Sequence, residues 1–224
     1  HKRYIAMLPL SHIFGAIMGY MAKLYTGSLT YTCTDMRAGI GDIPVVRPTT
    51  LVLVPGLVEI ILNIAKLKGR AFLGDLELIM CGAAPVPPRQ MEECRELGIT
   101  LCAGYGLTEC ANLTSGNCDT DKKPESMGHI YPEQQVKVVD GELWIKGDNV
   151  MKEYYKDPEH TAEVLEDGWF KTGDLVKFDD NDWIYITGRI KNLIILPNGE
   201  NVSPEEIEEL FYKQSLVKDC LVQE

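Results

Sequence analysis

The sequence predicts an α/β protein: a parallel sheet with crossover helices, then a small antiparallel β subdomain, then a truncated α+β C-terminal segment. Two observations support this. Short apolar runs alternate with segments of helical periodicity through the first half of the chain. The second half changes to paired strand patterns joined by compact turns. A length of 224 residues suits one or two compact domains with a sizeable core.

The first half reads as a strand–helix alternation. Gly27, Gly69 and Gly98 each follow a helical pattern, at the position where glycine commonly ends a helix. Short links between strands and helices favour parallel strands with right-handed crossovers. The expected elements are a strand over 4–8, a helix over 13–25, a strand over 51–54, a helix over 57–67, a strand over 76–80, a helix from Pro88 to Gly98 and a strand over 99–102.

The second half reads as hairpins. Residues 135–139 and 142–145 flank Asp140-Gly141, a strong two-residue turn signal. A second hairpin over 174–186 turns at 179–182, and two further short strands follow Gly188. Ser203-Pro-Glu-Glu206 then predicts a helix with a capping box and proline at its first position. The apolar stripe of that helix is Ile207, Leu210 and Phe211.

These patterns divide the chain into three parts. Residues 1–115 form a partial α/β subdomain, residues 116–187 a β-rich subdomain, and residues 188–224 the start of a truncated C-terminal domain. Both ends of the sequence fall in strand-like runs, so we expect the chain to be a piece of a longer protein.

Composition excludes several classes of function. The chain has 45% hydrophobic and 25% charged residues, as in soluble globular proteins. A formal net charge of −11 disfavours nucleic-acid binding, because an acidic surface repels phosphate backbones. Seven cysteines, an odd number with no Cys-x-x-Cys pair, predict reduced thiols and a cytoplasmic location. No apolar run reaches membrane-spanning length, and no signal peptide opens the chain.

Three loops with small or polar residues follow predicted strands. They are Pro9-Leu-Ser-His12, Cys81-Gly-Ala-Ala-Pro85 and Ala103-Gly-Tyr-Gly-Leu-Thr-Glu109. Ligands of parallel α/β sheets bind beyond the carboxyl ends of the strands, and glycines such as Gly104 and Gly106 let backbone amides approach a flat or anionic ligand. Taken singly, each glycine-rich loop is more often a structural turn than a nucleotide site. The neighbouring hydroxyl of Thr108 and carboxylate of Glu109 suit phosphate together with Mg²⁺.

Five motifs in a fixed order give a more specific indication. They are 8–15 (Leu-Pro-Leu-Ser-His-Ile-Phe-Gly), 82–85, 104–109, 168–175 (Gly-Trp-Phe-Lys-Thr-Gly-Asp-Leu), and 188–191 leading to 199–204. Together they resemble the adenylate-forming superfamily of acyl-CoA synthetases, luciferases and peptide-synthetase adenylation domains. The resemblance spans nearly the whole chain. It implies an enzyme that activates a carboxylic acid with ATP and transfers the acyl group to CoA, releasing AMP and pyrophosphate.

The resemblance implies the residues of a nucleotide site. Gly82, Ala83 and Ala84 would flank the adenine, and Tyr105 would stack near it. Thr108 would hold the α-phosphate.

Four further residues receive roles from the same resemblance. Glu109 would bind Mg²⁺, and Asp174 would accept hydrogen bonds from both ribose hydroxyls. Arg189 would bind the ribose or the phosphates. Lys191 matches the hinge about which the C-terminal lid of these enzymes turns between the two half-reactions.

His12 and Phe14 match positions that line the acyl pocket and its gate. The stretch 198–207 most resembles fatty-acyl-CoA synthetases, with aryl-acid ligases close to it. An amino-acid substrate is disfavoured, because residues 4–20 contain no Asp or Glu to pair with an ammonium group. The acyl chain and the oligomeric state are not determined by the sequence.

Structural alternatives exist for several of these residues. Asp174 can cap a turn, His12 can be a packed core histidine, and Arg189 can pair with a surface carboxylate. Residues 179–182 have a superficial likeness to a calcium loop but lack its glycine and distal glutamate, so we interpret them as a hairpin turn. Ser11 and His12 are neighbours on an extended segment and point apart, so they form no nucleophile–base pair.

Two lysines of the superfamily are missing from this sequence, one in a glycine-rich phosphate loop and one near the end of the lid. We therefore expect the 224-residue chain alone to be inactive. The alternatives are a non-catalytic nucleotide-binding module, if the parent protein also lacks both lysines, or another adenylating enzyme of the superfamily.

Overall fold

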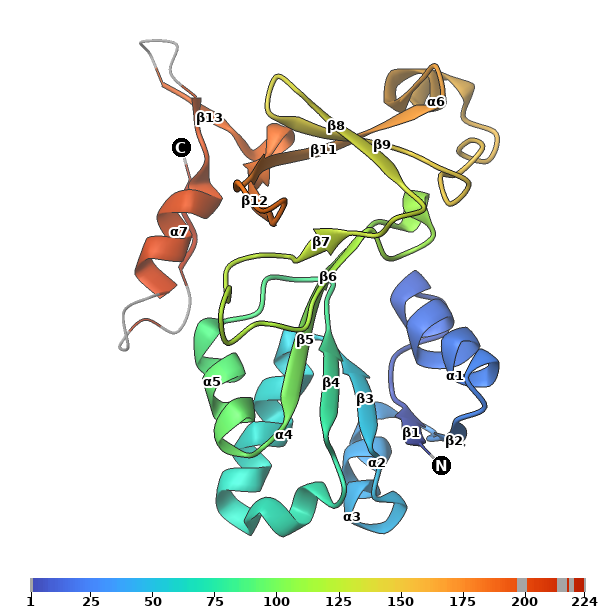
Figure 1. Cartoon of the computed structure of the whole chain (residues 1–224), viewed down its shortest axis with the longest axis vertical. Coiled ribbons are helices and arrows are strands. Elements are labelled where there is room, and N and C mark those ends of the chain that lie inside the picture. Colours follow the sequence, from blue (N-terminus) through green and yellow to red (C-terminus); the bar gives the residue numbers. More distant parts are fainter. Residues whose placement is uncertain (1, 197–200, 213–216, 218–219, 224) are drawn as a thin grey trace. The chain divides into compact units, whose positions relative to one another are not determined.

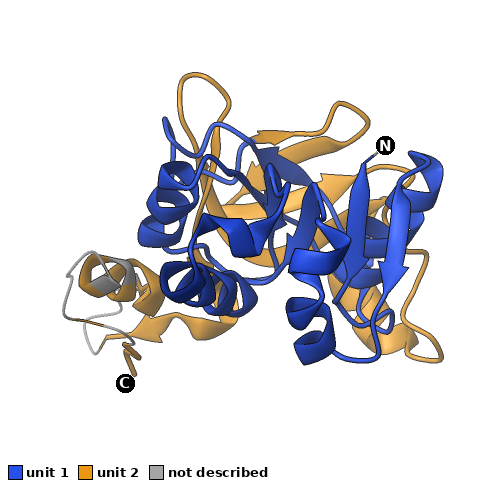
Figure 2. Cartoon of the chain, turned by 90° about the horizontal axis from the view of Figure 1, so that it is seen from below, with its two compact units in different colours: residues 1–128 blue, residues 129–224 orange. Residues whose placement is uncertain are grey.

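A computed structural model describes residues 2–196, 201–212, 217 and 220–223 (Figure 1). The chain forms two compact units, residues 1–128 and 129–224 (Figure 2). The α/β pattern falls in the first unit and the hairpins in the second, which confirms the predicted fold class. The finer division at residues 115 and 187 stays a prediction.

The first unit is built on a sheet with the strand order β2-β1-β3-β4-β5-β6, and β7 belongs to the second unit by its residue numbers. Neighbours from β2 to β5 are parallel, and β6 runs antiparallel to β5. The parallel sheet predicted from the apolar runs is therefore confirmed. The strands are β1 (Arg3–Ala6), β2 (Leu29–Thr32), β3 (Thr50–Leu53), β4 (Leu78–Cys81), β5 (Thr100–Tyr105), β6 (Ser115–Asn117) and β7 (His129–Ile130).

Helical segments connect these strands. The two longest, α4 (Pro55–Lys68) and α5 (Pro88–Glu96), both begin with proline and contact each other. A Lys66–Glu93 ion pair of 2.7 Å joins them. The others are η1 (Gly15–Met21), α1 (Ala22–Tyr25), α2 (Met36–Gly41), α3 (Ile43–Val46), η2 (Arg70–Leu73) and η3 (Thr108–Cys110).

The hydrophobic core of the first unit surrounds β3, in which all four residues are buried. Strands at the centre of a parallel sheet are covered on both faces, so they consist of continuous apolar runs. One face of α4 supplies Leu57, Val58, Ile61, Leu62 and Ala65 to this core. The helix predicted from the periodicity over 57–67 is therefore confirmed. Its buried face packs into the same core as β3.

The second unit contains an antiparallel sheet of order β10-β11-β9-β8, with β12 paired to β11. The β8–β9 turn places Asp140 at φ 50° and Gly141 at φ 85°, as a two-residue hairpin turn requires. The elements are β8 (Gln135–Val139), β9 (Glu142–Lys146), α6 (Pro158–Val164), β10 (Leu165–Glu166), β11 (Trp169–Phe178), β12 (Ile184–Arg189), η4 (Ile190–Asn192), β13 (Ile194–Ile195), β14 (Asn201–Val202) and α7 (Pro204–Tyr212). Both predicted hairpins and the helix after Ser203 are confirmed.

Some elements differ from the predictions. The helix expected over 13–25 is a π-helix, η1, over most of its length, because the apolar pattern does not distinguish helix types. The strand β2 and the short helices α2, α3 and α6 were not predicted. Each has seven residues or fewer, which is too short for a periodic pattern to stand out.

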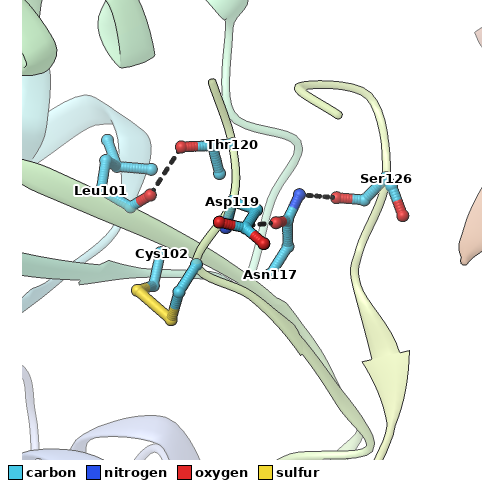
Figure 3. The surroundings of a disulfide bond; sticks show 7 residues. Leu101, Cys102, Asn117, Asp119, Thr120 and Ser126 are labelled. Carbon is cyan, nitrogen blue, oxygen red and sulfur yellow. Dashed lines mark hydrogen bonds between the residues drawn. A yellow bond between two sulfur atoms is a disulfide. The ribbon is translucent and has the colours of Figure 1, made fainter. Parts of the chain in front are cut away.

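The expectation of seven reduced thiols is wrong for one pair. Cys102 on β5 and Cys118 just after β6 form a disulfide (Figure 3). The two lie 16 residues apart in the sequence, and only the pairing of β5 with β6 brings them together. Five cysteines form no disulfide: Cys33, Cys81, Cys94, Cys110 and Cys220.

Among the described residues, no helix has the length and apolar character needed to cross a membrane.

The packing of α4 predicts unequal effects for two of its leucines. Leu62 is 1% exposed and Leu67 is 88% exposed. Leu62→Ala should lower the free energy of unfolding by about 2–5 kcal/mol, because it opens a cavity in the core. Leu67→Ala, the matched control, should change it by less than about 0.5 kcal/mol. Urea unfolding of the two variants measures both values, and equal losses would contradict the described orientation of the helix.

Candidate functional site

Three loops meet at the carboxyl edge of the parallel sheet in the first unit. Gly82 follows β4, Gly104 lies near the end of β5, and Phe14 lies beyond β1. A Cβ atom on Gly82 would stand 3.2 Å from the Gly104 oxygen and 3.4 Å from the Phe14 ring. A side chain at position 82 would therefore require the Gly104 carbonyl to shift by a few tenths of an ångström. The structure confirms that the motifs at 8–15, 82–85 and 104–109 lie together within this unit.

The loop after β4 carries a strained backbone. Ala83 has φ 68°, in the left-handed region that residues with a side chain rarely adopt. Ala83 and Ala84 are both exposed, whereas Gly82 is buried. Strain of this kind at an exposed loop supports a functional role for the segment.

The loop after β5 is held in a compact turn. The Thr114 amide donates to the Tyr105 oxygen at 2.8 Å, and the Asn112 amide donates to the Leu107 oxygen at 3.0 Å. A Cβ atom on Gly106 would lie 1.3 Å from the Asn112 oxygen, so no other residue fits there without moving the backbone. This turn leaves Thr108 exposed at its tip.

Glu109 lies beside Thr108 in the short helix η3 and is partly exposed. Within the described part of the chain, no group of three or more His, Cys, Asp or Glu side chains is arranged to hold a metal ion. Mg²⁺ ordinarily takes one or two protein carboxylates and fills its other positions with water and substrate phosphates. A single carboxylate at Glu109 therefore fits the implied ion when phosphate is present.

His12 and Phe14 differ in burial. Phe14 is 6% exposed and packs against Gly82. His12 is exposed, and its Nδ1 atom accepts a hydrogen bond of 3.1 Å from the Phe14 amide. The interpretation of His12 as a packed core histidine is therefore wrong. The Phe14 ring packs against the loop at Gly82, whereas His12 is open to solvent.

Asp174 and Arg189 form an ion pair in the second unit. They are register partners on β11 and β12, and Arg189 Nε donates to Asp174 Oδ1 at 2.6 Å. The Asp174 side chain is 5% exposed and the Arg189 side chain 55% exposed. One charge is thus buried against the sheet while its partner reaches solvent. Arg189 pairs with a buried carboxylate, and not with a surface one.

Neighbouring groups fix the turn that precedes Asp174. The Asp174 amide donates to Thr172 Oγ1 at 3.0 Å, and the Gly173 amide donates to Glu142 Oε1 at 2.8 Å. Glu142 also accepts from the Trp144 indole at 2.8 Å. No local pattern in the sequence indicates a role for Glu142, because its contact with the Thr-Gly-Asp turn arises only from the pairing of β9 with β11.

Lys191 lies in η4, directly after Arg189, and lines a pocket of about 460 Å³. His160 Nδ1 donates a 2.6 Å hydrogen bond to Asp157 Oδ2 at this pocket. That bond raises the pKa of His160 above its usual value and lowers the pKa of Asp157. The lining consists of Tyr154, Tyr155, Asp157, His160, Glu163, Val164 and Lys191.

The candidate site therefore has two parts. The first unit assembles residues 82–84 with 104–109 and Phe14, and the second unit assembles Asp174 with Arg189. That the two parts enclose one nucleotide stays a prediction. The motif over 199–204 lies partly outside the described residues, since 199 and 200 are among those not described.

A sequence profile of the AMP-binding enzyme family matches residues 1–155 of this chain. The chain belongs to the AMP-binding enzyme family. Curated relatives of the chain include two acid–CoA ligases. The indoleacetate–CoA ligase of Aromatoleum aromaticum is 32% identical over 93% of this chain and 43% of its own length. The long-chain-fatty-acid–CoA ligase of Bacillus subtilis is 29% identical over 99% of this chain and 42% of its own.

Solved structures of two enzymes share the fold. The o-succinylbenzoate CoA synthetase MenE of Bacillus subtilis, in complex with its acyl-adenylate, has a TM-score of 0.83 at 26% identity over 97% of this chain and 47% of its own. The same enzyme in complex with ATP and magnesium has a TM-score of 0.81 at 26% identity. The amide bond synthetase McbA of Marinactinospora thermotolerans has a TM-score of 0.84 at 26% identity over 97% of this chain and 47% of its own. The chain thus spans less than half the length of these family members.

The contact at Gly106 predicts the effect of a single methyl group. Gly106→Ala should lower the free energy of unfolding by about 1–3 kcal/mol or more, because the Asn112 carbonyl must move to admit the Cβ atom. The matched control is Gly56→Ala on α4, where a Cβ atom meets nothing within 4 Å. That change should raise stability by about 0.5–1 kcal/mol, because alanine favours the helix. Thermal and urea unfolding measure both changes.

Proposed function

We propose that the protein containing this chain is an AMP-forming acid–CoA ligase. It uses ATP to convert a carboxylic acid to an acyl-adenylate, releases pyrophosphate, and transfers the acyl group to CoA with release of AMP. The observation that carries the proposal is the contact of Gly82 with Gly104 and Phe14, because it unites three family motifs at one sheet edge. The named CoA ligases among the relatives support it.

In this proposal, the adenine and the α-phosphate bind to the loops of the first unit. Gly82, Ala83 and Ala84 offer a thin exposed backbone surface to a flat base, and Tyr105 stacks beside it. Thr108, exposed at the tip of the turn, donates its hydroxyl to the α-phosphate. The rigid turn over 106–114 keeps this hydroxyl in place before ATP arrives, and such preorganisation reduces the ordering that binding requires.

The ribose binds to the Asp174 carboxylate in this proposal. This carboxylate is buried and held on one side by Arg189, so its orientation is set before the ligand binds. A carboxylate that accepts both ribose hydroxyls forms two charge-assisted hydrogen bonds. The Arg189 side chain is 55% exposed, so in this proposal it contacts the ribose or the phosphates from the same side as Asp174.

Glu109 would hold Mg²⁺ together with the phosphates, and the ion would neutralise charge on the leaving pyrophosphate. The substrate carboxylate attacks the α-phosphorus, and pyrophosphate leaves. No covalent enzyme intermediate is needed, so this chain's residues contribute by positioning and by charge neutralisation. The two superfamily lysines absent from the 224 residues must come from elsewhere in the protein, and we expect no turnover from the chain alone.

Lys191 follows Arg189 after one intervening residue, Ile190, and is exposed. We assign it to the hinge between the two half-reactions. In this role its backbone rotates and carries the C-terminal segment from the adenylation geometry to the thioester-forming geometry.

The acid substrate is apolar or aromatic in this proposal. Phe14 is buried beside the nucleotide loops, and His12 lies at the open side of the same loop. Fatty-acid metabolism and a cytoplasmic location are proposed with it, the second from the five cysteines that form no disulfide. No acidic residue occurs over 4–20 to bind an ammonium group.

A second candidate concerns the acceptor. The likeness to the amide bond synthetase favours an amine as the group that attacks the acyl-adenylate. The first half-reaction is the same for both acceptors. AMP formation with CoA alone, against AMP formation with an amine alone, decides between them.

The substrate prediction is tested by pyrophosphate release from the whole protein with panels of fatty, aryl and amino acids. Apolar or aromatic acids should exceed amino acids in kcat/KM by at least about a hundredfold, since an unpaired buried charge costs roughly 2–5 kcal/mol. Activity confined to amino acids would refute it. ATP binding without pyrophosphate release from any acid would favour the non-catalytic nucleotide module.

Asp174→Ala in the whole protein should lower kcat/KM for ATP by about a hundredfold or more. Two hydrogen bonds to a charged acceptor are lost, each worth roughly 1.5–3 kcal/mol. Asp148→Ala, a change at an exposed carboxylate, is the control and should leave ATP dependence intact. If Asp174→Ala reduced stability but left KM for ATP unchanged, Asp174 would be a turn residue only.

A further inference from the structure

The disulfide between Cys102 and Cys118 lies next to the proposed phosphate-binding loop. The register of β5 and β6 pairs Ala103 with Asn117, Gly104 with Gly116 and Tyr105 with Ser115. The disulfide is the next rung of this ladder, with a Cα–Cα distance of 4.2 Å. Directly opposed strand residues lie about 4.5–5.5 Å apart, so the pairing itself brings the sulfurs together.

The hairpin that this bond closes is short. Three register pairs join β5 to β6, and the turn beyond them carries Thr108 and Glu109. The turn also contains Ala111 at φ 52° and Asn112 at φ 92°, two left-handed residues with side chains. The disulfide is the covalent cross-link at the base of this three-rung ladder, so it contributes to holding the strained turn in place.

The two cysteine residues differ in exposure. Cys118 is exposed, whereas Cys102 is 6% exposed. An external thiolate can reach Cys118 from solvent. Three other cysteines in this unit, Cys81, Cys94 and Cys110, are buried, and burial raises the pKa of each thiol to about 12. A protonated buried thiol is a poor nucleophile, so these cysteines do not compete in the exchange.

We propose that Cys102–Cys118 is a site of reversible thiol–disulfide exchange with a dithiol, and that its reduction loosens the 106–114 turn and weakens nucleotide binding. The first thiolate of the dithiol attacks the Cys118 sulfur, and Cys102 leaves as a thiolate that takes a proton. The second thiol then displaces Cys118 from the mixed disulfide. Two electrons pass to the protein, which holds two thiols, while the dithiol becomes a disulfide.

Reduction leaves the surrounding fold in place. The Thr120 hydroxyl donates to the Leu101 oxygen at 2.8 Å, and Asn117 Nδ2 donates to the Ser126 oxygen at 2.8 Å (Figure 3). The Ser115 hydroxyl donates to the Met127 oxygen at 2.8 Å. These bonds attach β6 and the segment after it independently of the sulfurs. The effect of reduction is therefore confined to the turn.

The exchange is tested on the 224-residue chain with dithiothreitol as the probe. The chain is equilibrated with mixtures of reduced and oxidised dithiothreitol, its thiols are alkylated, and the peptides are analysed by mass spectrometry. Cys102 and Cys118 should become alkylated together, in one two-electron step, while Cys81, Cys94 and Cys110 stay unchanged. Alkylation of Cys118 in the fully oxidised chain would overturn the proposal.

Hydrogen exchange measures the loosening. Amides of residues 103–117 should exchange at least about tenfold faster after reduction, and those of α4 should not change. Cys118→Ser should show the fast exchange in both redox states, whereas Cys220→Ser, the control, should keep the difference. Equal exchange in the oxidised and reduced wild-type chain would also overturn the proposal.

The effect on nucleotide binding rests on the proposed function. ATP affinity of the whole protein should fall at least about fivefold on reduction, the lower end of ordinary coupling between sites. Cys118→Ser should bind with the weaker affinity in both states. If no ATP binds in either state, the proposed function fails while the exchange result stands. If ATP binds equally in both states, the proposed function stands and the coupling fails.

Discussion

The close approach of the Gly82 and Gly104 backbones governs the rest of the candidate site. Parallel strands place their carboxyl ends at one edge, and β4 and β5 are neighbours there. The space between the two loops is tight at Gly82, where a Cβ atom would lie 3.2 Å from the Gly104 oxygen, and the Phe14 ring lies on the remaining side. Once these loops are fixed, the exposed surface of Ala83 and the position of Thr108 follow. The site is therefore a property of the sheet edge, and small residues are what make it possible.

The second unit contains a buried carboxylate, Asp174, whose charge must be compensated. An ionised side chain at 5% exposure requires compensation, and Arg189 supplies it from the neighbouring strand. Because the Arg189 side chain remains half-exposed, it keeps part of its hydration. Glu142 holds the turn from the opposite strand. A charged group kept ready in this way loses little freedom when a ligand arrives, which is how fixed polar groups favour binding.

The sequence predicted most strands and helices correctly because their apolar runs and glycine stops are local signals. The hairpin at Asp140-Gly141 and the helix start at Pro88 are examples. Contacts made across strands were not predictable in this way. The Cys102–Cys118 bond and the hydrogen bonds of Glu142 join residues that no local pattern connects. The sequence also did not show whether the His12 side chain is buried or exposed, because a histidine next to apolar residues is compatible with both. The candidate site residues were predicted from the order of the motifs. The structure then showed that Phe14 is buried and His12 is exposed.

The edge of the first sheet has a practical consequence for handling the chain. Strand β2 is the outermost strand at that side, and its Leu29 and Tyr31 are 65% and 41% exposed. Nearby on α1 and its start, Met21, Leu24 and Tyr25 are also exposed. An unpaired strand edge next to apolar side chains is a template for association between molecules. The net charge of −11 opposes that association through repulsion, which salt screens. Colloidal stability of the isolated polypeptide should therefore fall as ionic strength rises, and purification at low salt is the condition that its surface favours.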